Sequence, residues 1–152
     1  MNIWAPLPND TNTLYVEKLD DPGVGMPILW SPDPGVRCKV YCGSYSITTP
    51  AFGAVRWPRL RLLYWSDVVG SYPIGSSIGN SKTYRVTFGK FFRFTAGVSE
   101  QEYNIYWDSS IYLIHGFTLE LGVMAIDAGD VCFGGVLYID CWNDMSVKVG
   151  DK

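Results

Sequence analysis

Short runs in which every second residue is apolar, interrupted by glycine and proline, recur along this chain and constrain its fold more than any other feature. In the run from Val36 to Cys42, valine and cysteine alternate with arginine, lysine and tyrosine. Such an alternation places the apolar side chains on one face of a strand. A helical period is hard to find, and the best segment, Val98 to Tyr106, predicts at most one turn. The chain is therefore expected to be all-β.

Patterns of this kind predict eight or nine strands separated by turns. The runs are Thr13 to Leu19, Met26 to Trp30, Val36 to Cys42, Arg59 to Trp65, Tyr84 to Phe88 with its continuation Phe91 to Phe94 after a break at Gly89-Lys90, Tyr103 to Trp107, Ile111 to Ile114, Phe117 to Val123 and Val131 to Trp142. We expect a bulge near Gly43, a bend or bulge at Gly134-Gly135 and a long loop from Trp65 to Lys82. Without helical crossovers, these strands favour an antiparallel β-sandwich, and we favour a single jelly roll of about eight strands.

The chain length and the apolar content indicate one folded domain. The 152 residues suit a single domain over residues 1–152, and 47% of them are hydrophobic. Residues 1–12 are expected to form an extended N-terminal arm and residues 144–152 a short C-terminal tail. No linker or repeat divides the chain.

Net charge argues against general nucleic-acid binding. The chain carries a formal charge of −3, and its first seventeen residues contain no lysine or arginine. Binding to phosphates needs many cationic side chains, so no direct contact with nucleic acid is expected. We also expect no signal peptide and no transmembrane segment, because no apolar run reaches the roughly 18 residues that span a bilayer. The domain is expected to be soluble and to fold in a cytosol.

Four cysteines, Cys38, Cys42, Cys132 and Cys141, lack the spacing of a zinc site. We favour four reduced, buried thiols over any disulfide, and which cysteines would pair is left open. His115 is the only histidine, and it is interpreted as a hydrogen-bonded structural residue at a strand end. No catalytic, cofactor or metal residue is predicted, and the protein is not expected to be an enzyme.

Carboxylates cluster at Asp127 and Asp130, and again at Asp140 and Asp144. The Asp127–Asp130 turn is able to offer two oxygens to calcium, which usually takes six or more. We favour a tight turn in which the Asp side chains accept bonds from local backbone N–H groups. None of the possible pairs among the fifteen acids stands out as a glycosidase pair.

Two further groups of residues are candidates for binding. Arg56, Arg59 and Arg61, near Trp57, either face a phosphate or an acidic partner or form a solvated outer strand face, which we favour. The six tryptophans lie mostly beside turns or strand ends, where they either stack on sugars, fill a protein partner's pockets or plug the end of the core, which we favour for most of them. These are Trp4, Trp30, Trp57, Trp65, Trp107 and Trp142.

The order of features from Met26 to Asn143 resembles the single-jelly-roll proteins of virus particles, especially small capsid and head-decoration proteins of bacteriophages. The matching segments are Pro27 to Gly35, Cys38 to Thr49, Arg56 to Leu62, Thr83 to Phe88, Gly116 to Asp130 and Gly135 to Asp140. The resemblance implies a virion structural protein whose partners are copies of itself and other virion proteins. The missing basic arm implies a shell, decoration or spike-base role without genome contact.

A second interpretation is a carbohydrate-binding β-sandwich module or a receptor-binding tail or spike domain, with a glycan as partner. The segment from Gly135 to Asp140 is similar to the closing strand of several such modules. An assembly protein should bury more than about 1,000 Å² per contact, whereas a sugar-binding module should hold about three coplanar aromatics on an exposed face.

Overall fold

The computed structural model describes residues 15–53, 55–73, 77–89, 101–105 and 111–143, which form ten strands. The strands are β1 (Tyr15–Lys18), β2 (Ile28–Trp30), β3 (Val36–Thr48), β4 (Trp57–Tyr64), β5 (Asp67–Pro73), β6 (Thr83–Gly89), β7 (Gln101–Ile105), β8 (Ile111–Leu113), β9 (Phe117–Met124) and β10 (Val131–Asn143). These residues contain no helix, which confirms the all-β prediction, and hence no helix able to cross a membrane.

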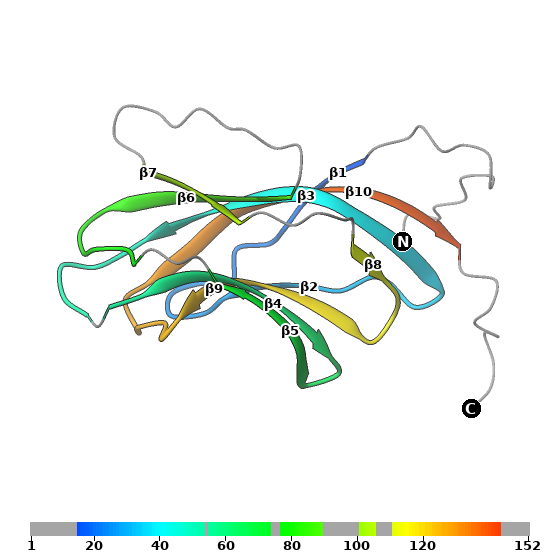
Figure 1. The fold of residues 1–152 in the computed structure, drawn as a ribbon, viewed down its shortest axis with the longest axis horizontal. Helices are drawn as coiled ribbons and strands as arrows, with labels where there is room; N and C mark the ends of the chain where they lie inside the picture. The colour runs from blue at the N-terminus through cyan, green and yellow to red at the C-terminus, as the bar shows by residue number, and fades with distance from the viewer. Residues whose placement is uncertain (1–14, 54, 74–76, 90–100, 106–110, 144–152) are drawn as a thin grey trace.

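The strands form two stacked sheets, seen as an upper and a lower layer in Figure 1. The six-stranded sheet has the order β1-β10-β3-β6-β7, with β8 also beside β3, and the four-stranded sheet has the order β2-β9-β4-β5. Neighbouring strands are antiparallel except β6 and β7, which run parallel. The predicted antiparallel β-sandwich is therefore confirmed, with β7 as the exception.

The two longest strands, β3 and β10, lie side by side and carry both predicted irregularities. Their register shifts between Phe133 and Val136, which confirms the bulge expected at Gly134-Gly135. A second shift leaves Tyr41 as the extra residue on β3, two positions before the bulge expected near Gly43. Bulges bend a strand and increase its twist, so both shifts curve the centre of the larger sheet.

A buried tyrosine ties the two sheets together. Tyr45 of β3 is fully buried, and its hydroxyl donates a hydrogen bond to the Gly122 carbonyl oxygen of β9 at 2.7 Å. Burial raises the pKa of this phenol well above its ordinary value, so it stays a donor. Leaving a buried hydroxyl without a hydrogen-bond partner would destabilise the folded state by about 1–3 kcal/mol. This cost explains why the ring points across to the other sheet.

One local prediction was wrong, and another is confirmed in part. The loop expected from Trp65 to Lys82 contains β5, whose apolar residues are interrupted by Gly70 and closed by Pro73 and therefore gave only a weak strand pattern. The strand expected from Tyr103 to Trp107 is confirmed in part, because residues 101–105 form β7, which pairs with β6, and contain no helical turn. The expected strand from Phe91 to Phe94, the arm at 1–12 and the tail at 144–152 lie outside the described residues.

Candidate functional site

A disulfide joins the two central strands. Cys38 of β3 and Cys141 of β10 are direct partners in the antiparallel ladder, with Cα atoms 4.2 Å apart, and their sulfurs are bonded. Direct partners in such a ladder have Cβ atoms within bridging range. The prediction of four reduced thiols is therefore wrong for this pair. No local spacing indicates the bond, because the two cysteines are 103 positions apart.

The other two cysteines are buried free thiols, as predicted. Burial raises the pKa of Cys42, and it raises the pKa of Cys132 to about 12 with help from the Asp130 and Glu120 carboxylates. A thiol that stays protonated is a weak nucleophile and metal ligand. Within the described ranges, no group of three or more His, Cys, Asp or Glu side chains is placed to hold a metal ion.

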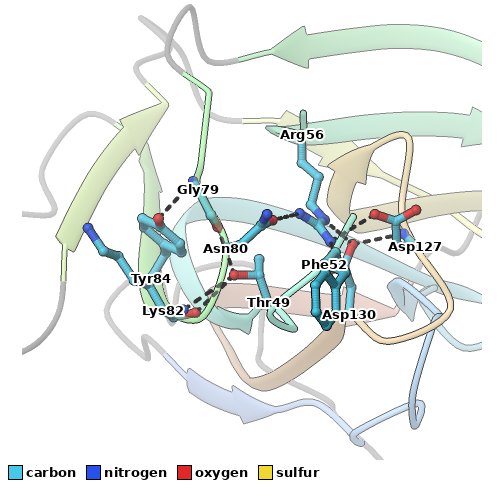
Figure 2. Close-up of polar contacts among 9 residues, drawn as sticks. All are labelled: Thr49, Phe52, Arg56, Gly79, Asn80, Lys82, Tyr84, Asp127 and Asp130. Atoms are coloured by element: carbon cyan, nitrogen blue, oxygen red, sulfur yellow. Dashed lines mark hydrogen bonds and ion pairs between the residues drawn. The ribbon is translucent and has the colours of Figure 1, made fainter. Parts of the chain in front are cut away.

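Arg56 is the centre of a buried polar network that closes one end of the sandwich (Figure 2). Its side chain is 0% exposed, and its Nε donates to Asp130 Oδ2 at 2.7 Å. One terminal nitrogen lies 2.8 Å from Asp127 Oδ2, and the other donates to Asn80 Oδ1 at 2.8 Å. The prediction of a solvated outer face is therefore wrong for Arg56, because the residue shares the inward parity of the buried Pro58 and Leu60, whereas Arg59 and Arg61 alternate with them.

The turn from Asp127 to Asp130 confirms the interpretation as a tight turn. The Asp127 backbone N–H donates to Asp130 Oδ2 at 2.8 Å, and the Asp130 N–H donates to the Asp127 carbonyl at 3.0 Å. Both carboxylates face Arg56, a partner that the sequence pattern did not indicate. Gly53 passes so close that an added Cβ would overlap the Arg56 guanidinium and the Asp127 carboxylate. The cluster therefore works as a structural latch between loops.

The other two arginines do lie on the outer face of the four-stranded sheet, as predicted. Arg61 of β4 and Glu120 of β9 are direct partners and form two parallel hydrogen bonds of 2.7 Å. These bonds raise the pKa of Arg61, whereas partial burial lowers that of Arg59. Because its fork is already engaged within the sheet, Arg61 is poorly placed to bind a phosphate.

The edge strand β5 leaves an apolar row exposed. Val68, Val69 and Tyr72 are all exposed, and β4 is the one neighbour that the described residues give this strand. From Asp67 to Pro73 there is no lysine or arginine. Natural proteins usually blunt an edge with such charges, because an unpaired apolar edge invites pairing with another chain.

An exposed aromatic cluster continues this edge at the end of β4. Trp65 is 65% exposed, and its ring meets His115 edge-on at 5.7 Å between centroids, while Tyr64 packs on Phe117 at 4.8 Å. Trp65 has a φ of 55°, which a bulky residue rarely adopts, and its N–H donates to the Gly116 carbonyl at 2.7 Å. His115 is exposed in this turn, and its neighbour is an indole ring. The expectation that tryptophans plug the core is wrong for Trp65.

The remaining tryptophans are placed differently. Trp30 packs against the core, as predicted, and Trp57 and Trp142 are half-buried. Trp142 and the exposed Tyr112 meet at an interplanar angle of 74°, so they do not form a flat platform. Trp4 and Trp107 lie outside the described residues.

A pocket of about 220 Å³ opens between the sheets beside the edge strands β1 and β2. Tyr15 and Glu17 line it from β1, Trp30 and Asp33 from β2 and the segment after it, and Cys38 and Cys141 also border it. No sequence motif indicated this pocket. The sequence indicates only that Tyr15 and Glu17, two positions apart in a strand pattern, lie on the same face of that strand.

Comparison with known proteins yields no match: no family model, no curated protein and no solved structure matches this chain. Function is therefore inferred from the chain's own residues.

Proposed function

We propose that this protein is a virion structural protein that assembles into or decorates a capsid, of the bacteriophage type, through protein–protein contacts. The observation that carries the proposal is the exposed apolar edge of β5, which has no lysine or arginine and is continued by the exposed Trp65. A contiguous apolar surface of this kind on a water-exposed domain marks an interaction site. Tryptophan is also among the residues that dominate binding energy in protein interfaces.

The strand order supports the finer assignment to a jelly roll. When β7 and β8 are set aside, the remaining strands pair as β1-β10-β3-β6 in one sheet and β2-β9-β4-β5 in the other. Apart from the β4–β5 hairpin, each of these strands is followed by one in the other layer, and the last two strands insert between earlier ones, as nested Greek keys do. We interpret this arrangement as a single jelly roll with β7 and β8 inserted before β9. Fold alone does not fix function, so this order supports the proposal without carrying it.

Strain at Trp65 adds to the case for an interface. A left-handed backbone conformation costs a bulky residue roughly 1–2 kcal/mol, yet here it projects an indole into water. Strained residues of this sort cluster at functional sites. Burial of the exposed ring by a partner in the assembled state would offset this conformational cost.

The disulfide is compatible with a virion as the final location. Such bonds persist in oxidising surroundings, which include the surfaces of particles outside the cell, and are rare in the reducing cytosol. A chain that folds in the host cytoplasm would then form the Cys38–Cys141 bond after release, since the two residues are already paired in the ladder.

The carbohydrate-binding alternative has less support from the arrangement of aromatics. A flat sugar platform needs coplanar rings, whereas Tyr112 and Trp142 meet at 74° and Tyr64 and Trp65 at 62°. In an edge-to-face pair the two rings pack against each other, which leaves less flat ring surface for a sugar to stack on.

Mass in solution, measured by light scattering behind a sizing column with particle imaging of the same sample, tests the proposal. We expect trimers, pentamers or shells. A monomer at every concentration, combined with saturable binding on a glycan array, would contradict it in favour of the sugar-binding alternative.

A further inference from the structure

The pocket beside β1 and β2 exists because two edge strands direct large side chains between the sheets. Tyr15 and Glu17 pair with Ile139 and Leu137, which are buried in the core, so all four side chains share the inner face. Trp30 pairs with the buried Leu119 and faces inward from the other sheet. Figure 1 shows the chain passing from the upper to the lower layer between β1 and β2. The cavity of about 220 Å³ lies at this side of the sandwich.

The pocket is negatively charged. Glu17 and Asp33 line it, and none of the described residues that line it is a lysine or arginine. Burial, followed by the nearby Asp33 and Asp20 carboxylates, raises the pKa of Glu17. Like charges around a partly desolvated carboxylate disfavour its ionised form, and a cation at this place would relieve that repulsion.

The aromatic rings and the size of the cavity favour a ligand the size of one long cationic side chain. Tyr15 and Trp30 border the same space, and the face of such a ring attracts an ammonium or guanidinium group. Sites for drug-sized ligands hold roughly 300–1,000 Å³. A cavity of about 220 Å³ therefore suits one long side chain better than an oligosaccharide.

We propose that the pocket formed by Tyr15, Glu17, Trp30 and Asp33 binds the cationic side chain of a lysine or arginine presented by a protein partner. This inference rests on the proposed assembly function, for which it supplies a second contact distinct from β5. An inward acid on an edge strand also discourages strand pairing, but that role alone needs neither the aromatic walls nor Asp33.

The test is an NMR titration of the full chain with Nα-acetyl-lysine amide and Nα-acetyl-arginine amide. Nα-acetyl-norleucine amide serves as the uncharged probe of similar length. We expect saturable shifts of the Trp30 indole N–H, assigned with a Trp30→Phe variant, for the cationic probes and at least a tenfold weaker effect for norleucine amide. Glu17→Gln should weaken binding at least fivefold, whereas Asp67→Asn, which removes an exposed acid at the β4–β5 turn, should not change it.

Three outcomes would overturn the inference. Equal binding of norleucine amide would make the pocket simply apolar, and equal losses in the Glu17 and Asp67 variants would reduce the effect to net charge. Saturable Trp30 shifts with methyl glucoside and none with either cation would make it a sugar site. The probes are small molecules, so the titration reads the pocket whether or not the chain assembles. A monomer that binds the cations would contradict the assembly function alone, and an assembly that ignores them would contradict only the pocket.

Discussion

The side chains that flank strand β4 differ in burial: Arg56 before the strand is buried, and Trp65 after it is exposed. Just before the strand, the guanidinium of Arg56 is 0% exposed and is held by Asp127 and Asp130. Just after it, the indole of Trp65 is 65% exposed in a strained backbone conformation. A charged group inside and an indole in water reverse the usual distribution. The difference separates an end where the buried arginine has its partners within the chain from an end where the indole is left exposed.

We expect the closed end to contribute to stability and, under the proposed function, the open end to contact a partner. Arg56 is held by side chains from two loops, one carrying Asn80 and the other Asp127 and Asp130 (Figure 2). Figure 1 shows the β4–β5 hairpin bending away from the six-stranded sheet, which leaves its apolar edge accessible. Changes at the first end should therefore alter the free energy of unfolding, and changes at the second should alter assembly.

The largest effect is expected at the closed end. Arg56→Met leaves two carboxylates near one another without their cation, one of them fully buried, and breaking such a pair costs about 3–5 kcal/mol of unfolding free energy. Urea unfolding at neutral pH measures this loss. Arg61→Met is the matched control, because it breaks a partly exposed pair worth about 0–1 kcal/mol. A loss in the control as large as in Arg56→Met would contradict the role of the latch.

A covalent tie provides the next comparison. Reduction of Cys38–Cys141 should lower the free energy of unfolding by about 2–4 kcal/mol, because the unfolded chain regains the freedom of a long loop. Unfolding curves with and without a thiol reductant measure it. A variant with both Cys38→Ala and Cys141→Ala should be insensitive to the reductant, and sensitivity there would point to the other cysteines.

At the open end, Trp65→Asn should change stability little. The exposed ring contributes few core contacts, and asparagine tolerates the positive φ better than tryptophan, so the unfolding free energy should stay within about 1 kcal/mol of the wild type. Assembly measured by light scattering should weaken in the same variant. A large loss of stability would show that the indole supports the fold instead of a partner.

The smallest effect is expected in the pocket, where none of the described lining residues offers Glu17 a cation of the kind that Arg56 supplies to Asp127 and Asp130. The raised pKa of Glu17 means that its contribution to stability is present below pH 4.5 and is lost as the pH rises through its folded-state pKa. Glu17→Gln should remove this loss, so its unfolding free energy relative to the wild type should increase between about pH 4 and pH 7. A constant difference across that range would contradict the assignment of the shift to Glu17.

Local patterns predicted most of the sandwich but few of its polar contacts. Period-two alternation indicated β3 and β10, because one face of each strand is buried and the pattern records that burial. The edge strand β5 was not predicted, because residues 67–72 are exposed or only half-buried. A strand without a buried face does not need apolar residues at every second position.

The candidate sites depend on contacts that no spacing encodes. Asp127 and Asp130 were predicted to form a turn, yet their partner Arg56 lies 74 positions before Asp130. Cys38 meets Cys141 only because β10 pairs with β3. The pocket needs the register of β1 as well as the position of Trp30 in the other sheet. Long-range register, set by the whole fold, decides all three.

The most direct test of the open end compares two valines that are equally exposed on the two edges of the sandwich. Val69 on β5 and Val16 on β1 are each 56% exposed. Lysine at position 69 should block edge pairing, so light scattering of Val69→Lys should give a monomer, while Val16→Lys should give the same assembly as the wild type. If both variants assemble like the wild type, or both fail equally, β5 is not the surface through which this protein acts.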